Sequence, residues 1–216
     1  SAITPHLPEA LLKRALAAAE VIVDELYKSH ALCEIAPYLP EALLERALAT
    51  AEVLEDEVDK LHALCKIAPH LPEALLERAL AAAEAIENEQ YKSRTLCKIA
   101  LHLSKDLKQE ILECALATAE AIEYEASKSR ALCMVAPHLP EALLERALTV
   151  AKAILDDSNR ESPEALIAIA PHLPKELLGC ALVVAEAIEY EASKSRALSA
   201  ITPHLPEALL KRALAA

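Results

Sequence analysis

The sequence predicts an all-α chain built from stacked two-helix repeats, and three observations support this fold class. A phrase close to Leu-Pro-Glu-Ala-Leu-Leu recurs seven times along the 216 residues. Apolar residues inside each repeat follow helical spacing, and a single Gly leaves almost no turns of the kind that β-hairpins need. We therefore expect about 13 helices, in the order first helix, second helix, six times over, and then a closing first helix.

The repeated phrase keeps a regular register. Successive copies are spaced by 32, 32, 32, 36, 34 and 32 residues, with four residues inserted around 104–109 and two within 156–161. Self-similarity at such a period is typical of repeat architectures, so residues 1–216 are predicted to form one tandem-repeat domain. The copies, of which the fourth is diverged, begin at Leu7, Leu39, Leu71, Leu103, Leu139, Leu173 and Leu205.

The first helix of each repeat is expected to start at the proline of the phrase. A proline in the first turn loses no hydrogen bond, and the Glu that follows suits the positive end of the helix dipole, as at Pro8 and Glu9. Apolar residues then recur at helical spacing, as in the row Leu12, Leu16, Ala19 and Val23. A second row beside it widens the apolar face, as a helix with several neighbours requires.

The second helix of each repeat is expected to end at a Pro-His-Leu-Pro turn, as after Pro37 and Pro69. The break between the two helices is marked in the fifth repeat by Ser162-Pro163-Glu164, a cap followed by a first-turn proline and an acid. In the other complete repeats we place the break near Asp24, Asp56, Asn88, Tyr124 and Tyr190.

One helix pair is too small to bury its own apolar faces, so the pairs must stack, and we expect a right-handed α-solenoid, or superhelix. The repeats resemble the tetratricopeptide and HEAT classes, and more narrowly the short two-helix tandem repeats of bacterial proteins. The resemblance covers the whole chain and implies architecture, because packing residues define these classes. The repeat is shorter than a tetratricopeptide and lacks its Trp, Gly and Phe positions, so that family's peptide-carboxylate clamp is not carried over.

The formal charge of −12 bears on possible partners. Nucleic acid and anionic membrane surfaces are poor candidates for so acidic a chain. A basic protein or peptide segment would be attracted, although acidity also serves solubility alone. No stretch has the length and apolar character of a membrane span, and the opening residues do not resemble a signal peptide, so we expect a cytoplasmic protein.

Residues 1–18 recur without change as residues 199–216. We therefore expect the chain to be a piece of a longer array with a higher-order period of 198 residues, the offset between Ser1 and Ser199. The outer helices keep their apolar rows, as at Leu11 and Leu210, where solenoids usually carry a polar cap. Weak end-to-end self-association is a further expectation.

Six cysteines invite a metal or disulfide interpretation, but no Cys-x-x-Cys pair is present. Equivalent residues of stacked repeats lie about 8–10 Å apart, too far for a disulfide. We expect free thiols that serve as small buried apolar groups, and no bound metal. Four share one position of the second helix and two replace an arginine of the first: Cys33, Cys65, Cys97 and Cys133, and Cys114 and Cys180.

Six of the eight histidines occupy the turn after the second helix, where a metal column or a pH switch is one interpretation. The spacing of one repeat is too wide for two rings to share a metal, so a ring that caps the last carbonyls of the second helix is favoured. These histidines are His6, His70, His102, His138, His172 and His204, and Tyr38 takes the same place once.

Charged residues form two columns. In one, a Glu precedes a Lys by three residues on the second helix, as in Glu25 and Lys28, which predicts weak ion pairs on a solvated face. The other runs along the first helix as Glu20 and its equivalents, and inverts to Lys152 in the fifth repeat. The functional alternative is a recognition stripe, composed of Tyr27, Lys28, Lys60, Tyr91, Lys92, Lys128 and Lys194.

No catalytic triad, phosphate-binding loop or zinc-protease motif occurs in the sequence. We therefore expect no enzymatic activity and no cofactor. The leading hypothesis is a structural or protein-interaction scaffold. The alternative is a sensor or regulatory repeat array of a larger multidomain signalling protein, and the full-length reading frame would separate the two.

Overall fold

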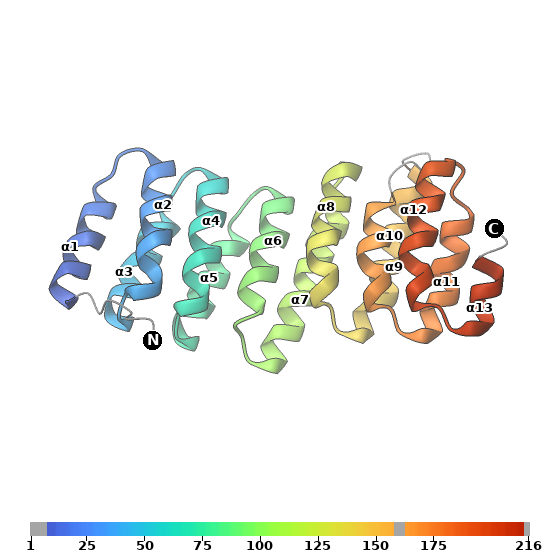
Figure 1. Cartoon of the computed structure of the whole chain (residues 1–216). Coiled ribbons are helices and arrows are strands. Elements are labelled where there is room, and N and C mark those ends of the chain that lie inside the picture. The colour runs from blue at the N-terminus through green and yellow to red at the C-terminus, as the bar shows by residue number, and fades with distance from the viewer. Residues whose placement is uncertain (1–7, 158–162, 214–216) are drawn as a thin grey trace. The chain divides into compact units, whose positions relative to one another are not determined.

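The fold, given by a computed structural model, is described for residues 8–157 and 163–213 (Figure 1). Within these residues every regular element is helical, and thirteen α-helices alternate as the first and second helices of successive repeats. The predicted all-α fold of stacked helix pairs is confirmed. The chain groups into two compact halves, Ser1–Lys108 and Gln109–Ala216, and each is described by itself. The handedness of a superhelix and a single domain over residues 1–216 stay predictions.

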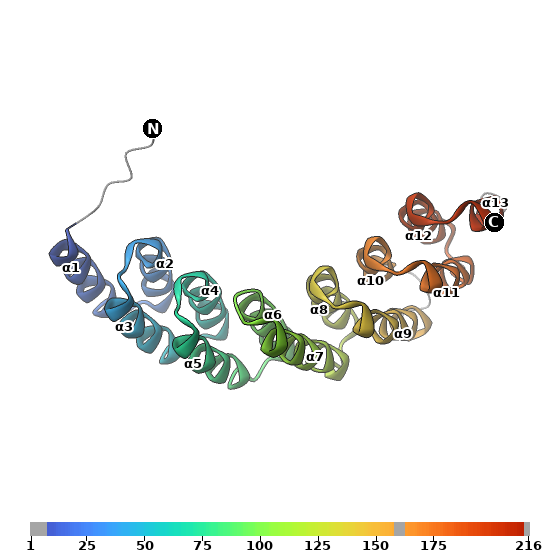
Figure 2. The ribbon, with the colours of Figure 1, turned by 90° about the horizontal axis from the view of Figure 1, so that it is seen from below.

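The first half arranges its helices in two layers (Figure 2). First helices pack on first helices, α1 on α3 and α3 on α5, while second helices pack on second helices, α2 on α4 and α4 on α6. Short 3₁₀ turns follow α2 and α4 at Ala36–Tyr38 and Ala68–His70. The helices are α1 Glu9–Glu20, α2 Glu25–Ile35, α3 Glu41–Glu52, α4 Glu57–Ile67, α5 Glu73–Glu84 and α6 Glu89–Ala100.

The second half repeats this pattern, with α8 packed on α10, α10 on α12, and α9 on α11. Equivalent 3₁₀ turns are Ala136–His138, Ala170–His172 and Thr202–His204. The helix α7 begins four residues before the boundary between the halves. The helices are α7 Lys105–Ala121, α8 Glu125–Val135, α9 Glu141–Asp157, α10 Glu164–Ile169, α11 Lys175–Glu186, α12 Glu191–Ile201 and α13 Glu207–Ala213.

Both insertions accompany a first helix that is longer than usual. The helices α7 and α9 have 17 residues, against 12 for most first helices. In α7 the addition lies mainly at the start, and in α9 it lies at the end, where the helix continues to Asp157. The following helix, α10, is correspondingly short at 6 residues. The predicted cap Ser162 lies outside the described residues.

The predicted breaks inside the repeats are confirmed, because Asp24, Asp56, Asn88, Tyr124 and Tyr190 are the residues that precede second helices. At the first three, a side-chain oxygen accepts a backbone N–H of the first turn, as the N–H of Tyr27 donates to Asp24 Oδ1 at 3.2 Å. The prolines lie one residue earlier than expected. The first helix starts at the Glu after Pro8, and the Pro8 carbonyl accepts the Leu11 N–H at 2.8 Å.

Leucine and alanine form the core of both halves. Leu32, Leu64 and Leu96 of the second helices are completely buried. A column of alanines on the first helices lets neighbouring helices approach closely, and Ala47, Ala79, Ala115, Ala147 and Ala181 have no exposed surface. The expected core position at Val23 is wrong, because α1 ends at Glu20 and Val23 stands 93% exposed in the following turn. Among the described residues, no helix combines the length and apolar character that crossing a membrane requires.

Candidate functional site

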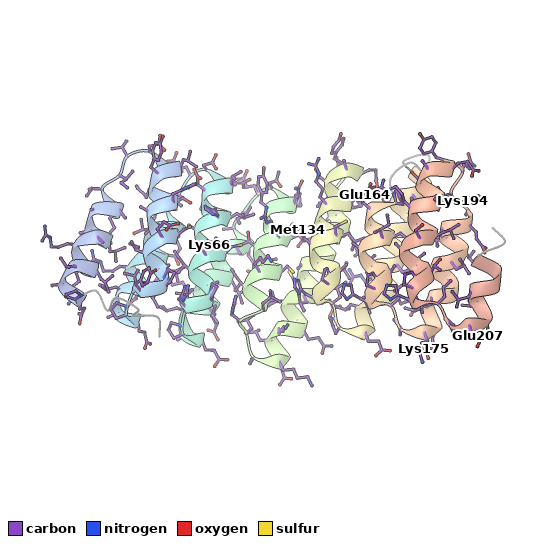
Figure 3. The ribbon with its side chains drawn as sticks, in the orientation of Figure 1. Lys66, Met134, Glu164, Lys175, Lys194 and Glu207 are labelled. Carbon is purple, nitrogen blue, oxygen red and sulfur yellow. The ribbon has the colours of Figure 1, made fainter. Side chains whose placement is uncertain are left out.

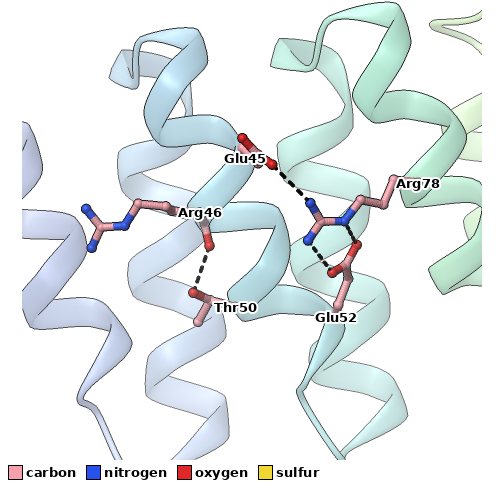
Figure 4. A network of polar contacts seen from close by, with 5 residues as sticks. All are labelled: Glu45, Arg46, Thr50, Glu52 and Arg78. Atoms are coloured by element: carbon pink, nitrogen blue, oxygen red, sulfur yellow. Dashed lines mark hydrogen bonds and ion pairs between the residues drawn. The ribbon is translucent and has the colours of Figure 1, made fainter.

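Ion pairs connect successive first helices on the surface of the molecule. Arg78 on α5 donates from Nε and Nη2 to the two carboxylate oxygens of Glu52 on α3, both at 2.7 Å (Figure 4). Its Nη1 also lies 3.5 Å from Glu45 Oε1. A guanidinium and a carboxylate in this two-point geometry fix each other's orientation. The acidic column of the first helices thus pairs with the arginine column of the next repeat.

The same offset of 26 residues recurs in both halves. Arg46 Nη2 lies 2.7 Å from Glu20 Oε2, and Arg146 Nε lies 2.7 Å from Glu120 Oε1. We call these contacts the ion-pair row, formed by Glu20–Arg46, Glu52–Arg78 and Glu120–Arg146.

The ion-pair row is interrupted between α9 and α11. Lys152 stands at the place of the acid and Cys180 at the place of the arginine. Both members of the pair differ from those of the ion-pair row. Lys152 therefore faces a cysteine and not an arginine on α11. With the long guanidinium absent, the surface between the two helices is left hollow.

This hollow is a groove of about 330 Å³ with a mainly apolar wall. Val183 contributes to it, half exposed, at a place where other first helices carry the smaller Ala49, Ala81 and Ala117. Lys152 supplies the cation at the rim. The lining residues are Glu145, Leu148, Thr149 and Lys152 of α9, and Leu177, Cys180, Val183 and Val184 of α11.

A second hollow, of about 480 Å³, lies between the first turns of α3 and α5. Its wall carries Glu41 and Glu45 beside Pro72 and Leu75. Glu45 already faces Arg78, so one of the two acids in this wall is neutralised within the fold. The groove between α9 and α11 is the better candidate site.

The acidic column of the second helices has a role that the sequence interpretation missed. Glu25 Oε2 accepts the backbone N–H groups of Glu55 and Asp56 at 2.9 and 2.8 Å, just before α4 begins. Glu57 accepts those of Glu87 and Asn88 before α6 in the same way. Each carboxylate therefore holds the start of the next second helix, where unpaired N–H groups and the helix dipole attract negative charge.

These contacts correct the expected pairing of Glu with Lys three residues later. Lys128 and Glu125 do form that pair at 3.5 Å. Glu25 and Glu57 instead turn toward the neighbouring repeat, because backbone N–H groups there lack an acceptor in their own helix.

The predicted recognition stripe divides between the two halves. In the first half, Lys28, Lys60 and Lys92 occupy one position on the adjacent helices α2, α4 and α6, each partly covered. In the second half, Lys128 lies on α8 and Lys194 on α12, and α10 packs between these two helices. The helix α10 begins too late in the repeat to carry an equivalent lysine. Figure 3 labels Lys194. Tyr27 is 65% exposed, whereas Tyr91 is partly covered. Whether this stripe binds anything stays a prediction.

A polar cluster joins α2 and α4 in the first half. The Ser29 hydroxyl donates to the Asp59 carbonyl at 3.1 Å, and His62 Nδ1 lies 3.5 Å from Ser29 Oγ and 3.8 Å from Cys33 Sγ. The rings of His30 and His62 are tilted against each other with centroids 5.3 Å apart. Sequence interpretation missed this pair, although the two histidines occupy the same position in successive repeats.

The electrostatics of this cluster do not favour a nucleophile. Burial raises the pKa of the Cys33 thiol to about 11, and burial followed by the charge of His30 lowers the pKa of His62. A neutral thiol beside a neutral imidazole is a poor attacking group near neutral pH. Burial, reinforced by Asp56 and Glu25, raises the pKa of Asp59.

The six thiols are free and differ in exposure. Burial raises the pKa values of Cys65 and Cys97 to about 11, like that of Cys33. The expectation of buried small groups holds for Cys97 and is wrong for Cys180, which is exposed because it lines the groove. Among the described residues, no three His, Cys, Asp or Glu side chains gather closely enough to hold a metal ion.

The capping role expected of the histidines after the second helices stays a prediction. At the end of α4 the backbone itself bonds a last-turn carbonyl, because the Ala68 N–H donates to the Leu64 oxygen. His70, His102, His172 and His204 are exposed, and His138 is partly covered. Burial, with the neighbouring His70, lowers the pKa of His102. His6 lies outside the described residues.

Comparison with protein-family models, curated proteins and solved structures gave no match to this chain. The stacked helix pairs and the recurring phrase define the class of protein: a helical tandem-repeat protein. Its relation to bacterial tetratricopeptide-like or HEAT-like families stays a prediction.

Proposed function

We propose that the chain is a non-enzymatic protein-interaction scaffold, and that the groove between α9 and α11 binds a peptide segment. The observation that carries this proposal is the coordinated change at Lys152 and Cys180. A repeat that served stacking alone would gain by keeping the pair found in the ion-pair row. Its loss leaves an apolar groove with a cation at the rim.

The groove chemistry indicates the kind of segment. Leu148, Val183 and Val184 offer an apolar wall to one aliphatic or aromatic side chain. Lys152 would attract a carboxylate next to that side chain, whereas the total charge of −12 favours basic segments at long range. We propose that the short-range contacts in the groove determine which segment binds. The preferred segment then places an acidic residue beside an apolar one.

Selection of displayed random peptides of roughly 12 residues against the whole protein tests this proposal. The double variant Lys152→Glu with Cys180→Arg rebuilds the ion pair and fills the groove. The variant Lys175→Gln, at an exposed residue at the start of α11 (Figure 3), changes the net charge by the same amount and leaves the groove lining intact.

Selected peptides should share an apolar residue next to Asp or Glu, and should lose binding at least tenfold in the double variant. Binding to the Lys175→Gln variant should be unchanged. Peptides that are predominantly basic, or that bind the double variant as well as the wild type, would contradict the proposal, as would a failure to enrich any peptide.

A further inference from the structure

The first helix of the fold has an apolar side chain that the rest of the described chain leaves uncovered. Leu11 on α1 is 45% exposed. The equivalent residues have a preceding first helix and are less exposed: Leu43, after α1, is 3% exposed and Leu143, after α7, is 9% exposed. Leu75 and Leu177, after α3 and α9, are partly covered. Beside Leu11, Leu12 and Leu16 of α1 are buried within the fold. The exposed face is therefore the one that a preceding first helix covers in other repeats.

The chain also contains the surface that fits this face. The helix α13 has the sequence of the first seven residues of α1, within a longer identity of residues 207–216 with residues 9–18. Leu209 is the counterpart of Leu11, and it is partly covered by α11. Its Cδ1 atom lies 3.8 Å from the place where a Cβ on Gly179 would stand.

Gly179 leaves the surface of α11 that contacts Leu209 without a side chain at this position. It is the single glycine of the chain, and it occupies the position of Glu45 and Glu113 in other first helices. Those acids face the arginine of the next repeat, at 3.5 Å from Arg78 and 3.7 Å from Arg146. On α11 that acid is replaced by a residue without a side chain, on which a leucine can rest directly.

We propose that α1 of a second copy of this chain can take the place of α13 on α11, so that copies associate head to tail. Because the two helices share their sequence, the contact between Leu209 and α11 shows how Leu11 of the second copy would be seated. The register also brings Arg14 of that copy opposite Glu186, as Arg46 stands opposite Glu20.

The association is weak in the wild-type chain because α13 competes for the same surface. A tethered helix has a high effective concentration, so it is displaced only by a large excess of second copies. The two contacting surfaces are unlike, and such heterologous contacts leave a free surface at each end for further copies. Weakening α13 should therefore strengthen association, whereas altering α1 should abolish it.

This contrast gives a sharp test with the 216-residue chain. Sedimentation velocity over a roughly hundredfold concentration range compares the wild type with Leu11→Asp, Leu209→Asp and the double variant. Leu209→Asp should associate at a concentration at least tenfold lower than the wild type. Leu11→Asp and the double variant should stay monomeric. Val53→Asp, which adds the same charge at a 71% exposed turn residue, should behave as the wild type.

Two further measurements keep the test decisive. Circular dichroism should show near wild-type helix content for every variant, and Leu209→Ala replaces Leu209→Asp if the charge unfolds neighbouring turns. A synthetic peptide of residues 199–216 should dissociate the Leu209→Asp assemblies by occupying the vacated surface. A monomeric Leu209 variant, or association that persists in the double variant, would overturn the proposal.

Discussion

Arg146 on α9 and Glu120 on α7 meet one repeat apart, with Arg146 Nε 2.7 Å from Glu120 Oε1. Glu113, two turns earlier on α7, lies 3.7 Å from the same guanidinium. One arginine thus binds two acids of the preceding first helix. This arrangement recurs at Arg78 with Glu52 and Glu45, and it is the contact whose loss opens the groove beside Lys152.

Breaking this pair should destabilise the fold slightly. In a double-mutant cycle with Glu120→Ala and Arg146→Ala, we expect a coupling free energy of about 0.5 kcal/mol, because both groups are partly exposed and screened by solvent. Urea unfolding of the four proteins measures it. The coupling should shrink in 1 M salt. A coupling that is zero at low salt would show that the contact does not contribute to stacking.

Glu57 should contribute more than an ordinary surface acid, because it accepts the Glu87 and Asn88 N–H groups ahead of α6. We expect Glu57→Gln to lower the free energy of unfolding by about 0.5–1 kcal/mol. Glu55→Gln removes the same charge from an exposed side chain and is the matched control. Equal effects of the two substitutions in urea unfolding would refute the capping role.

The histidine pair between α2 and α4 should make stability depend on pH. Burial and the charge of His30 hold the pKa of His62 below its usual value. The unfolded chain therefore binds a proton more readily, so this contribution to stability is present above about pH 6.5 and is lost as the pH falls toward the folded pKa. The charges of Lys66 and Arg94 also lower the pKa of His62, and the charge of Asp59 raises it.

Urea midpoints between pH 8 and pH 5 measure this effect. The His62→Asn variant should lose less stability on acidification than the wild type. His204→Asn, at an exposed histidine of the same chain, should follow the wild type. A His62→Asn profile parallel to that of the wild type would contradict the assignment.

The thiols should react in an order set by burial. A thiol with a pKa of about 11, as for Cys33, Cys65 and Cys97, is ionised to roughly one part in a thousand at pH 8. Exposed Cys180 should therefore react with Ellman's reagent first, and Cys180→Ser should remove the fast phase. Six equivalents should react after denaturation. A fast phase that survives in Cys180→Ser would place the accessible thiol elsewhere.

The fold could be predicted from the sequence because local signals are explicit in it. Asp24, Asp56 and Asn88 mark helix starts through their own side chains, and prolines mark the turns between repeats. The partners of the charged columns could not be predicted in this way. The sequence shows a column of acids and a column of arginines, but only the offset between stacked helices decides that Arg46 reaches Glu20.

The candidate site was hidden for the same reason. Lys152 is visible in the sequence as an inverted charge and Cys180 as a replaced arginine, yet nothing local links two positions on different helices. The contact of His30 with His62 likewise requires the packing of α2 on α4. Periodicity predicts which residues are equivalent, whereas the stacking geometry determines which of them touch.

The most direct test of the ion-pair row, and of its interruption at the groove, is a charge-restoration cycle measured by urea unfolding. Cys180→Arg alone should destabilise the protein, because the new guanidinium meets Lys152. Lys152→Glu and Cys180→Arg together should be more stable than the sum of the single changes by about 0.5 kcal/mol. Additive single changes would contradict the account, because they would mean that residues at these two positions do not meet across α9 and α11.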